Sequence, residues 1–245
     1  MAGLLSLFEK KKKTPVICSA VVVAAGSARR MEGIDKILTN LGELPVLVHT
    51  LYAMQDCDAI QEVVVVTRED LLVEVSRLCK EFALNKVTKV VVGGSERIHS
   101  VKAGIREVRQ DATLIAIHDG ARPLVTQTIL KDTVARAAET GAAAPMVPIT
   151  DTVKRVQDNL VKETVDRSEL YAVQTPQVFE ADLIRVAIDK AIDDSAILTD
   201  DCAAVERLGM KVSATVGSKE NIKITTPFDL MLGEAILEKR VLGEL

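Results

Sequence analysis

Three basic residues follow the first strongly apolar stretch of the chain and could neutralise an anionic ligand. Residues 19–25 are nearly all apolar and lead into a loop of small residues, after which come Arg29, Arg30 and Lys36. Small side chains let backbone N–H groups approach an anion closely, arginine binds phosphate oxygens through a planar fork, and lysine supplies a mobile point charge. The combination favours a polyphosphate ligand, although a tight turn with solvated basic residues would give the same pattern.

The loop differs from the two familiar phosphate-binding motifs. A dinucleotide-binding loop reads G-x-G-x-x-G and a P-loop ends in Gly-Lys-Ser/Thr, whereas "AAGSARRM" contains one glycine, Gly26. A dehydrogenase would also carry an acidic residue at the end of its second strand, where this chain has Thr67-Arg68. A nicotinamide-dependent dehydrogenase and a non-catalytic nucleotide sensor are the alternatives from another class, and neither of these two features supports the dehydrogenase.

Polar residues also follow later apolar runs. In "VVGGSERIHSV", the glycines including Gly94 permit close backbone approach, and Ser95 and Ser100 offer hydroxyl groups. In "IHDGARP", Asp119 lies just past an apolar run, where a carboxylate can reach sugar hydroxyls or a metal. In "NIKIT", Lys223 stands between two isoleucines, an expensive place for an ammonium group unless it meets an anion.

Apolar, β-branched runs alternate with helical patterns along most of the chain. Such alternation predicts a parallel sheet with right-handed crossovers, and ligands of these folds gather at the carboxyl ends of the strands. The runs are nearly all apolar, as strands buried on both faces are. Strands are expected at 19–25, 62–67, 87–92, 113–117 and 142–147, and helices near 45–55, 69–82, 96–109 and 126–139.

Residues 149–172 break this rhythm. Apolar and polar residues alternate there around "QDN", a turn signal, which predicts an antiparallel hairpin that leaves the main sheet. A protruding hairpin is often a dimerisation arm, and packing on its own subunit is the alternative. Beyond the hairpin we expect helices at 180–193, 199–208 and 226–240, and a strand over "KVSATV".

Composition narrows the class of protein. The 245 residues carry a net charge of −4 with 48% hydrophobic and 2% aromatic residues, which argues against a nucleic-acid binder and fits one large domain, residues 18–245. Four scattered cysteines suggest free thiols and a cytoplasmic location. Without an apolar run of about 20 residues, no membrane span is expected. Residues 1–17 are interpreted as a flexible tail, with membrane-surface contact as the alternative.

The ordered set of motifs resembles one family, the 2-C-methyl-D-erythritol 4-phosphate cytidylyltransferases. It comprises "AAGSARRM" with Lys36, "GGSERIHSV", "HDGARP", "DTVKR", "TVDR", "TPQ", "TD" at 199–200 and "NIKIT". The resemblance implies transfer of a cytidylyl group from CTP to methylerythritol phosphate. It implies an α/β Rossmann-like nucleotidyltransferase fold, a mostly parallel sheet with helices on both faces and a protruding β-hairpin arm. It also implies a homodimer through residues 149–172 and Mg²⁺ carried mainly by the CTP phosphates, with no metal ligands from the protein.

The resemblance assigns roles to the residues that match the family's motifs. The catalytic set is Arg30, Lys36, Arg167 and Lys223. The nucleotide-binding set is Ala24, Ala25, Gly26, Ser27, Ala28, Gly94, Ser95, Ser100 and Asp119. The acceptor-binding set is Asp119, Arg122, Thr152, Arg167, Thr175, Thr199 and Lys223, of which the arm residues are expected to reach the partner's site.

The chain departs from the family pattern at a few positions. Ala28 replaces a second loop glycine, Asp35 stands where proline is frequent, Ser95 where an acidic residue is common, and Gly120 replaces a usual alanine. A cytidylyltransferase for another polyol phosphate, such as ribitol 5-phosphate, is the nearer alternative. Such relatives favour a Gly-Gly start to the first loop, which this chain lacks.

Overall fold

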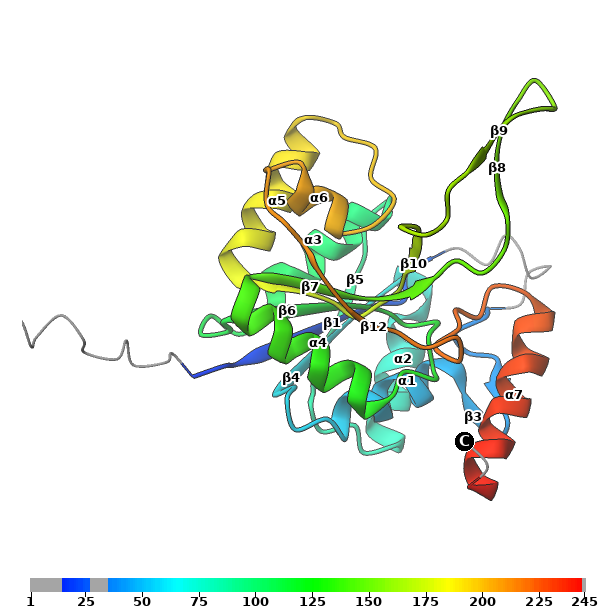
Figure 1. Cartoon of the computed structure of the whole chain (residues 1–245). Helices are drawn as coiled ribbons and strands as arrows, with labels where there is room; N and C mark the ends of the chain where they lie inside the picture. The colour runs from blue at the N-terminus through cyan, green and yellow to red at the C-terminus, as the bar shows by residue number, and fades with distance from the viewer. Residues whose placement is uncertain (1–14, 27–34, 244–245) are drawn as a thin grey trace, which may run out of the picture.

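An eight-stranded sheet forms the core of the computed structural model, which describes residues 15–26 and 35–243 (Figure 1). Its strands are β1 (Cys18–Val23), β4 (Glu62–Thr67), β5 (Val87–Val92), β6 (Leu114–Asp119), β7 (Ala142–Pro148), β10 (Tyr171–Val173), β11 (Gln177–Glu180) and β12 (Ser213–Val216). The order across the sheet is β10-β7-β11-β6-β1-β4-β5, and β12 also pairs with β7.

The first half of the sheet is parallel, as predicted. β1 pairs with β4 and β6, and β4 pairs with β5, all in parallel register. β1, β4 and β6 are buried almost throughout. The expectation that the run at 87–92 is buried on both faces is wrong, because β5 is the edge strand and Thr88 and Lys89 are exposed.

Seven α-helices lie in the described chain, and six of them divide between two hydrophobic clusters that pack on the sheet. The seven are α1 (Val46–Gln55), α2 (Leu72–Glu81) after a short 3-10 turn η2 (Glu69–Leu71), α3 (Arg97–Glu107), α4 (Gln127–Thr140), α5 (Ala181–Asp193), α6 (Cys202–Glu206) and α7 (Pro227–Leu242). One cluster collects side chains of α1, α2 and α4 with Ala20 and Val22 of β1, and the other collects side chains of α3, α5 and α6 with Val21. Because successive strand residues point to opposite sides, the two clusters lie across the sheet from each other, as Figure 1 shows.

The second half of the sheet contains a strand that the sequence did not predict. β11 (Gln177–Glu180) runs antiparallel between β6 and β7. From the sequence, only its first residue was noted, as the end of "TPQ", and its last residue was expected to begin a helix. β12 forms within the predicted "KVSATV" stretch. α6 is shorter than the expected helix at 199–208, because residues 199–201 form bends that lead into it.

A two-stranded hairpin projects from the body (Figure 1). β8 (Val153–Gln157) and β9 (Leu160–Val165) pair antiparallel with each other and form a sheet of their own. Asp158 and Asn159 join them with φ angles of 52° and 60°, the left-handed conformations of a tight hairpin turn. The expected range 149–172 also includes Tyr171, which pairs back onto β7. The hairpin's role in dimerisation stays a prediction.

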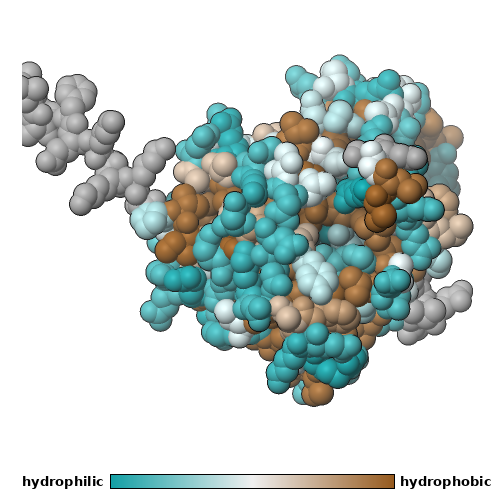
Figure 2. All heavy atoms as spheres, turned by 90° about the horizontal axis from the view of Figure 1, so that it is seen from below, coloured by the Kyte–Doolittle hydropathy of each residue, from teal (hydrophilic) through white to brown (hydrophobic). Residues whose placement is uncertain are grey.

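α7 covers a third, smaller cluster near the strand pair β2 (Asn40–Leu41) and β3 (Leu44–Pro45). Its start is fixed by a capping box, in which Thr226 and Asp229 satisfy each other's backbone N–H groups. None of the helices in the described part of the chain combines the length and apolar character needed to cross a bilayer. The face seen in Figure 2 mixes hydrophilic and hydrophobic patches.

Candidate active site

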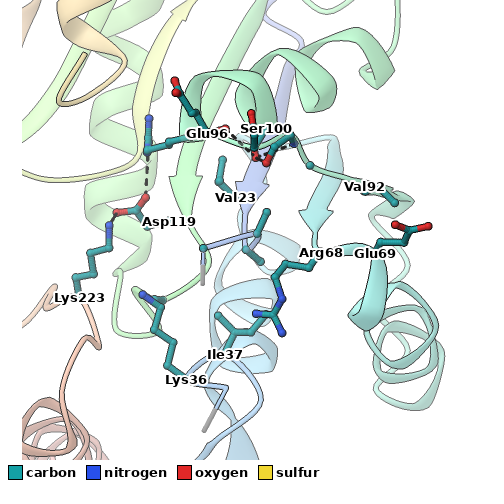
Figure 3. Close-up of a pocket in the computed structure, with 18 residues that line it drawn as sticks. Val23, Lys36, Ile37, Arg68, Glu69, Val92, Glu96, Ser100, Asp119 and Lys223 are labelled. Carbon is teal, nitrogen blue, oxygen red and sulfur yellow. Dashed lines mark hydrogen bonds and ion pairs between the residues drawn. The ribbon is translucent and has the colours of Figure 1, made fainter. Parts of the chain in front are cut away.

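A cleft of about 550 Å³ opens at the carboxyl ends of β1, β4, β5 and β6 (Figure 3). This is where a parallel sheet is expected to bind ligands. The lining residues of the described chain come from the loops after these strands and from two distant segments. They are Val23, Ala24, Ala25, Gly26, Lys36, Ile37, Arg68, Glu69, Val92, Gly93, Gly94, Ser95, Glu96, Arg97, Ser100, Asp119, Ala121 and Lys223.

The loop after β1 contributes its first three predicted residues to the cleft. Ala24, Ala25 and Gly26 line it, and the Ala24 N–H donates to the carbonyl of Val66 at 2.7 Å, which ties the loop to β4. Three other residues predicted for this loop lie outside the described residues: Ser27, Ala28 and Arg30.

Two glycines bring the loop after β5 against the start of α3. A Cβ on Gly93 would lie 2.6 Å from Ser100 Oγ, and one on Gly94 would lie 2.3 Å from the Cβ of His99. Neither position can carry a side chain without displacing its neighbours. Ser100 Oγ accepts a hydrogen bond of 3.1 Å from the Gly94 N–H. The predicted trio Gly94, Ser95 and Ser100 therefore meets at one wall of the cleft.

Asp119, at the end of β6, is the centre of a charge cluster. Its carboxylate lies 2.8 Å from Lys223 Nζ, 3.6 Å from Arg97 Nη2 and 3.5 Å from Arg122 Nε. Burial alone would raise the pKa of the Asp119 carboxyl, but Lys223, Arg97 and Arg122 together hold that pKa well below its usual range. The carboxylate is therefore ionised and oriented, and the Lys223 ammonium group faces the cleft beside it (Figure 3).

Behind Asp119, a chain of hydrogen bonds fixes its backbone. The Asp119 N–H donates to Thr175 Oγ1 at 3.1 Å, and that hydroxyl lies 3.0 Å from His118 Nδ1. His118 Nε2 lies 3.3 Å from the carbonyl of Arg122. A carbonyl can only accept, so Nε2 carries the proton and Nδ1 accepts from Thr175. Burial lowers the pKa of His118 to about 4, so the ring is neutral.

Thr175 and Arg122, expected at the acceptor, support the site from behind. The Thr175 side chain is buried, and the Arg122 Nη1 donates to the carbonyl of Asn221 at 2.7 Å. The Asn221 amide in turn donates to the carbonyl of Thr175 at 3.0 Å. This network carries the segment that ends in Lys223 to the edge of the cleft.

Three further predicted residues are exposed and lie apart from the cleft lining of this chain. Thr152 and Arg167 flank the hairpin, and Arg167 Nη1 donates to the carbonyl of Thr150. Thr199 is exposed before α6.

Sequence reasoning missed an arginine at the cleft. Arg97 contacts Asp201 through both of its terminal nitrogens, at 2.6 and 2.7 Å. Burial opposes the charge of Arg97, but Asp201 raises its pKa above the usual value. Gln177 of β11 holds this part of the chain, because its Oε1 accepts from the Asp201 and Cys202 N–H groups at 2.9 and 3.0 Å. Arg97 stands in the quoted "GGSERIHSV", but its partner lies 104 residues away, so no local pattern reveals the pair.

Comparison with known proteins gives one family. A family model described as 2-C-methyl-D-erythritol 4-phosphate cytidylyltransferase (IspD) matches residues 18–239. The protein of that name from Halalkalibacterium halodurans is 44% identical over 223 residues, which cover 91% of this chain and 97% of the relative. The one from Caldanaerobacter subterraneus is 43% identical over 228 residues, which cover 90% of this chain and 99% of that relative.

A solved structure agrees with this finding. The crystal structure of 4-diphosphocytidyl-2C-methyl-D-erythritol synthase from Anaerococcus prevotii matches with a TM-score of 0.81 at 29% identity, covering 91% of this chain and 96% of that one. The predicted α/β nucleotidyltransferase fold is confirmed. The chain belongs to the 2-C-methyl-D-erythritol 4-phosphate cytidylyltransferase family.

Proposed function

We propose that this protein transfers a cytidylyl group from CTP to 2-C-methyl-D-erythritol 4-phosphate, a step of isoprenoid precursor biosynthesis. The products are diphosphate and CDP-methylerythritol. One observation carries the proposal within the structure: Lys36 and Lys223 line the same cleft as the small-residue loops after β1 and β5. The relatives that share most of the chain's length carry the name of this activity.

The chemistry follows from charge. An oxygen of the acceptor phosphate attacks the α-phosphorus of CTP, a new P–O bond forms, and the α–β phosphoanhydride bond breaks with its electron pair leaving on diphosphate. Both reactants are polyanions, so their repulsion is the main obstacle. A phosphate monoester is already anionic near neutral pH and requires no general base. Cationic groups held in position lower the barrier by orienting the reactants and stabilising charge.

The residues at the cleft suit this kind of catalysis. Among the described lining residues, none is a histidine or cysteine. The cations are Lys36, Arg97 and Lys223, besides Arg68, which is paired with two carboxylates. His118 lies next to Asp119 in the chain but is buried and already hydrogen-bonded. Positioning and electrostatic stabilisation are therefore the roles left to the protein.

A magnesium ion is part of the proposal. Mg²⁺ keeps several waters and binds nucleotide phosphates with few protein ligands. Within residues 15–26 and 35–243, no group of three or more His, Cys, Asp or Glu side chains could hold a metal ion, which fits an ion carried by the triphosphate. When bound, the ion would neutralise charge on the phosphates. The Asp119 carboxylate, which lines the cleft, is already paired with the cationic side chains of Arg97, Arg122 and Lys223.

A homodimer through the hairpin and a cytoplasmic location complete the proposal. Val156, Leu160 and Val161 are exposed on the hairpin, and a two-stranded hairpin on its own is only marginally stable in water. A second subunit would cover these side chains and bring Thr152 and Arg167 to a cleft. All four cysteines are buried free thiols, as is usual in a reducing compartment.

An acceptor panel tests the proposed function. Diphosphate release from CTP is measured with methylerythritol phosphate, ribitol 5-phosphate and no acceptor, each with and without magnesium. We expect release that depends on both methylerythritol phosphate and magnesium. A preference for ribitol phosphate would support the other transferase, and CTP binding without any release would indicate a nucleotide sensor.

Within the same assay, Lys36→Ala should lower turnover by about 100-fold, the size of effect that loss of one preorganised charge contact produces. Lys131→Ala is the matched control, because Lys131 pairs with Asp58 at 2.9 Å on the surface and should leave turnover unchanged. Near-normal turnover of Lys36→Ala would remove Lys36 from the catalytic set.

A further inference from the structure

An ion pair lies beneath the turn that carries Lys36. Arg68 Nη1 lies 2.7 Å from Asp35 Oδ2, and the two side chains are only 27% and 15% exposed. Arg68 directly follows β4, so its backbone starts from the rigid sheet. Asp35 directly precedes Lys36. Neither residue is among the site residues predicted from the sequence.

Asp35 organises the whole turn. Its carbonyl accepts hydrogen bonds of 3.0 Å from the N–H groups of both Leu38 and Thr39, and its Oδ1 accepts one of 3.3 Å from the N–H of Ile37. The far side of the turn is anchored separately, because Ile37 is buried and its carbonyl accepts from the Leu47 N–H of α1 at 2.9 Å. The Asp35 side is anchored to the sheet through Arg68.

We propose that Arg68 and Asp35 are positioning residues for Lys36. In Figure 3 the Arg68 side chain turns down toward the turn, beside Ile37, whereas the Lys36 amino group points up into the cleft. The ion pair fixes the position from which the Lys36 side chain starts. This inference rests on the proposed function, in which Lys36 meets the phosphates of the nucleotide.

Direct binding of phosphate by Arg68 is the competing explanation, since Arg68 also lines the cleft. Its guanidinium is already engaged by carboxylates: Nε and Nη2 contact Asp70 at 3.0 and 2.9 Å, while Nη1 contacts Asp35. Together Arg68, Asp35 and Asp70 carry a net charge of −1, so this group does not attract a polyphosphate. The geometry therefore favours a role through the turn.

The test combines kinetics with a readout of the turn itself. Asp35→Asn and Arg68→Gln should each lower kcat by about tenfold, because a small displacement of a catalytic group is costly. In a Lys36→Ala background, the same changes should alter kcat by less than about twofold, since the group that they position is gone. Asp70→Asn is the matched control; it removes the exposed partner of Arg68 and should keep turnover near wild type.

Hydrogen exchange gives a second readout that does not depend on activity. In Asp35→Asn and Arg68→Gln, the amides of Leu38 and Thr39 should exchange faster than in wild type, while the thermal midpoint of unfolding stays the same. If the wild-type chain transfers nothing, the proposed function fails, and the exchange rates still decide whether the pair holds the turn.

Several results would overturn the inference. Unchanged exchange over residues 35–39 would mean that Arg68 does not anchor the turn. A tenfold loss that persists in the Lys36→Ala background would mean that the pair acts independently of Lys36. Tighter CTP binding with higher turnover in Asp35→Asn would mean that Arg68, once released, is itself a phosphate ligand.

Discussion

His118 illustrates how a buried side chain can help to fix a residue at the cleft, Asp119, without lining the cleft itself. The hydrogen bonds from the Asp119 N–H to Thr175 and from Thr175 to His118 all run in one direction. Protonation of His118 would place a second donor against the Thr175 hydroxyl and reverse part of this chain. This direction of the hydrogen bonds between Asp119, Thr175 and His118 therefore requires a neutral His118 ring.

The free energy of unfolding should depend on pH because the folded state requires the neutral form of His118. The pKa of His118 is lowered to about 4 by burial, against roughly 6.5 in an unfolded chain. Its contribution to stability is therefore complete above about pH 6.5 and is lost as the pH falls toward 4, because the unfolded chain takes up the proton first. Between pH 7 and 5 this loss amounts to about 2 kcal/mol.

Urea unfolding at pH 7 and at pH 5 would measure this loss in the free energy of unfolding, with His118→Gln as the comparison. The variant should lose about 2 kcal/mol less than wild type on acidification, since glutamine does not titrate. Equal losses in the two proteins would show that other groups account for the pH dependence.

At this scale, local sequence shows some of the site and misses the rest. Asp119 and Gly94 could be predicted because they stand at the ends of apolar runs that become strands of one sheet. Arg97 and Arg68 were missed because their partnerships depend on tertiary contacts, in one case with Asp201 far along the chain. Thr175 was expected to touch the acceptor, and its buried position follows from a network that no short motif describes.

At the scale of elements, buried parallel strands were the most predictable. β1, β4 and β6 are continuous apolar runs, and the structure places them where the runs lie. β11 escaped prediction because it has only four residues and its partners, β6 and β7, lie on both sides of it. Propensity does not reveal which gap in a sheet a short segment fills.

The hairpin turn offers a test of an element. Asp158 and Asn159 both adopt positive φ, which costs a β-branched residue roughly 1–2 kcal/mol. The double variant Asp158→Val/Asn159→Val should disorder the hairpin, so that proteases cleave residues 153–165 faster and turnover falls, while the thermal midpoint changes little. Asn159→Gly should keep both the hairpin and the activity. A valine variant as resistant to protease as wild type would contradict this account.

For the whole molecule, the question is whether one chain contains a complete site. In this chain Thr152 and Arg167 are exposed and lie outside the cleft lining. If the hairpin reaches a partner, each site is composite, with Lys36 from one chain and Arg167 from the other.

Subunit mixing tests this composition. Arg167→Ala and Lys36→Ala chains, each nearly inactive alone, are combined under conditions of verified exchange. Random pairing makes half of the dimers mixed, each with one intact site of two, so activity should recover to about a quarter of wild type. No recovery would place Arg167 and Lys36 in the site of the same chain and leave the hairpin with a structural role only.

The order of the sheet also has a consequence for how the chain is made. β6, β1, β4 and β5 all lie within residues 18–119 and can pair as soon as that stretch has left the ribosome. β7, by contrast, pairs in the described sheet only with strands that follow it in sequence. During translation the half of the sheet that contains β6, β1, β4 and β5 is therefore expected to assemble first. The edge of β6 stays unpaired until residues 177–180 have been synthesised and can form β11. During this interval the strand edge is exposed to other nascent chains that are being made from the same messenger RNA.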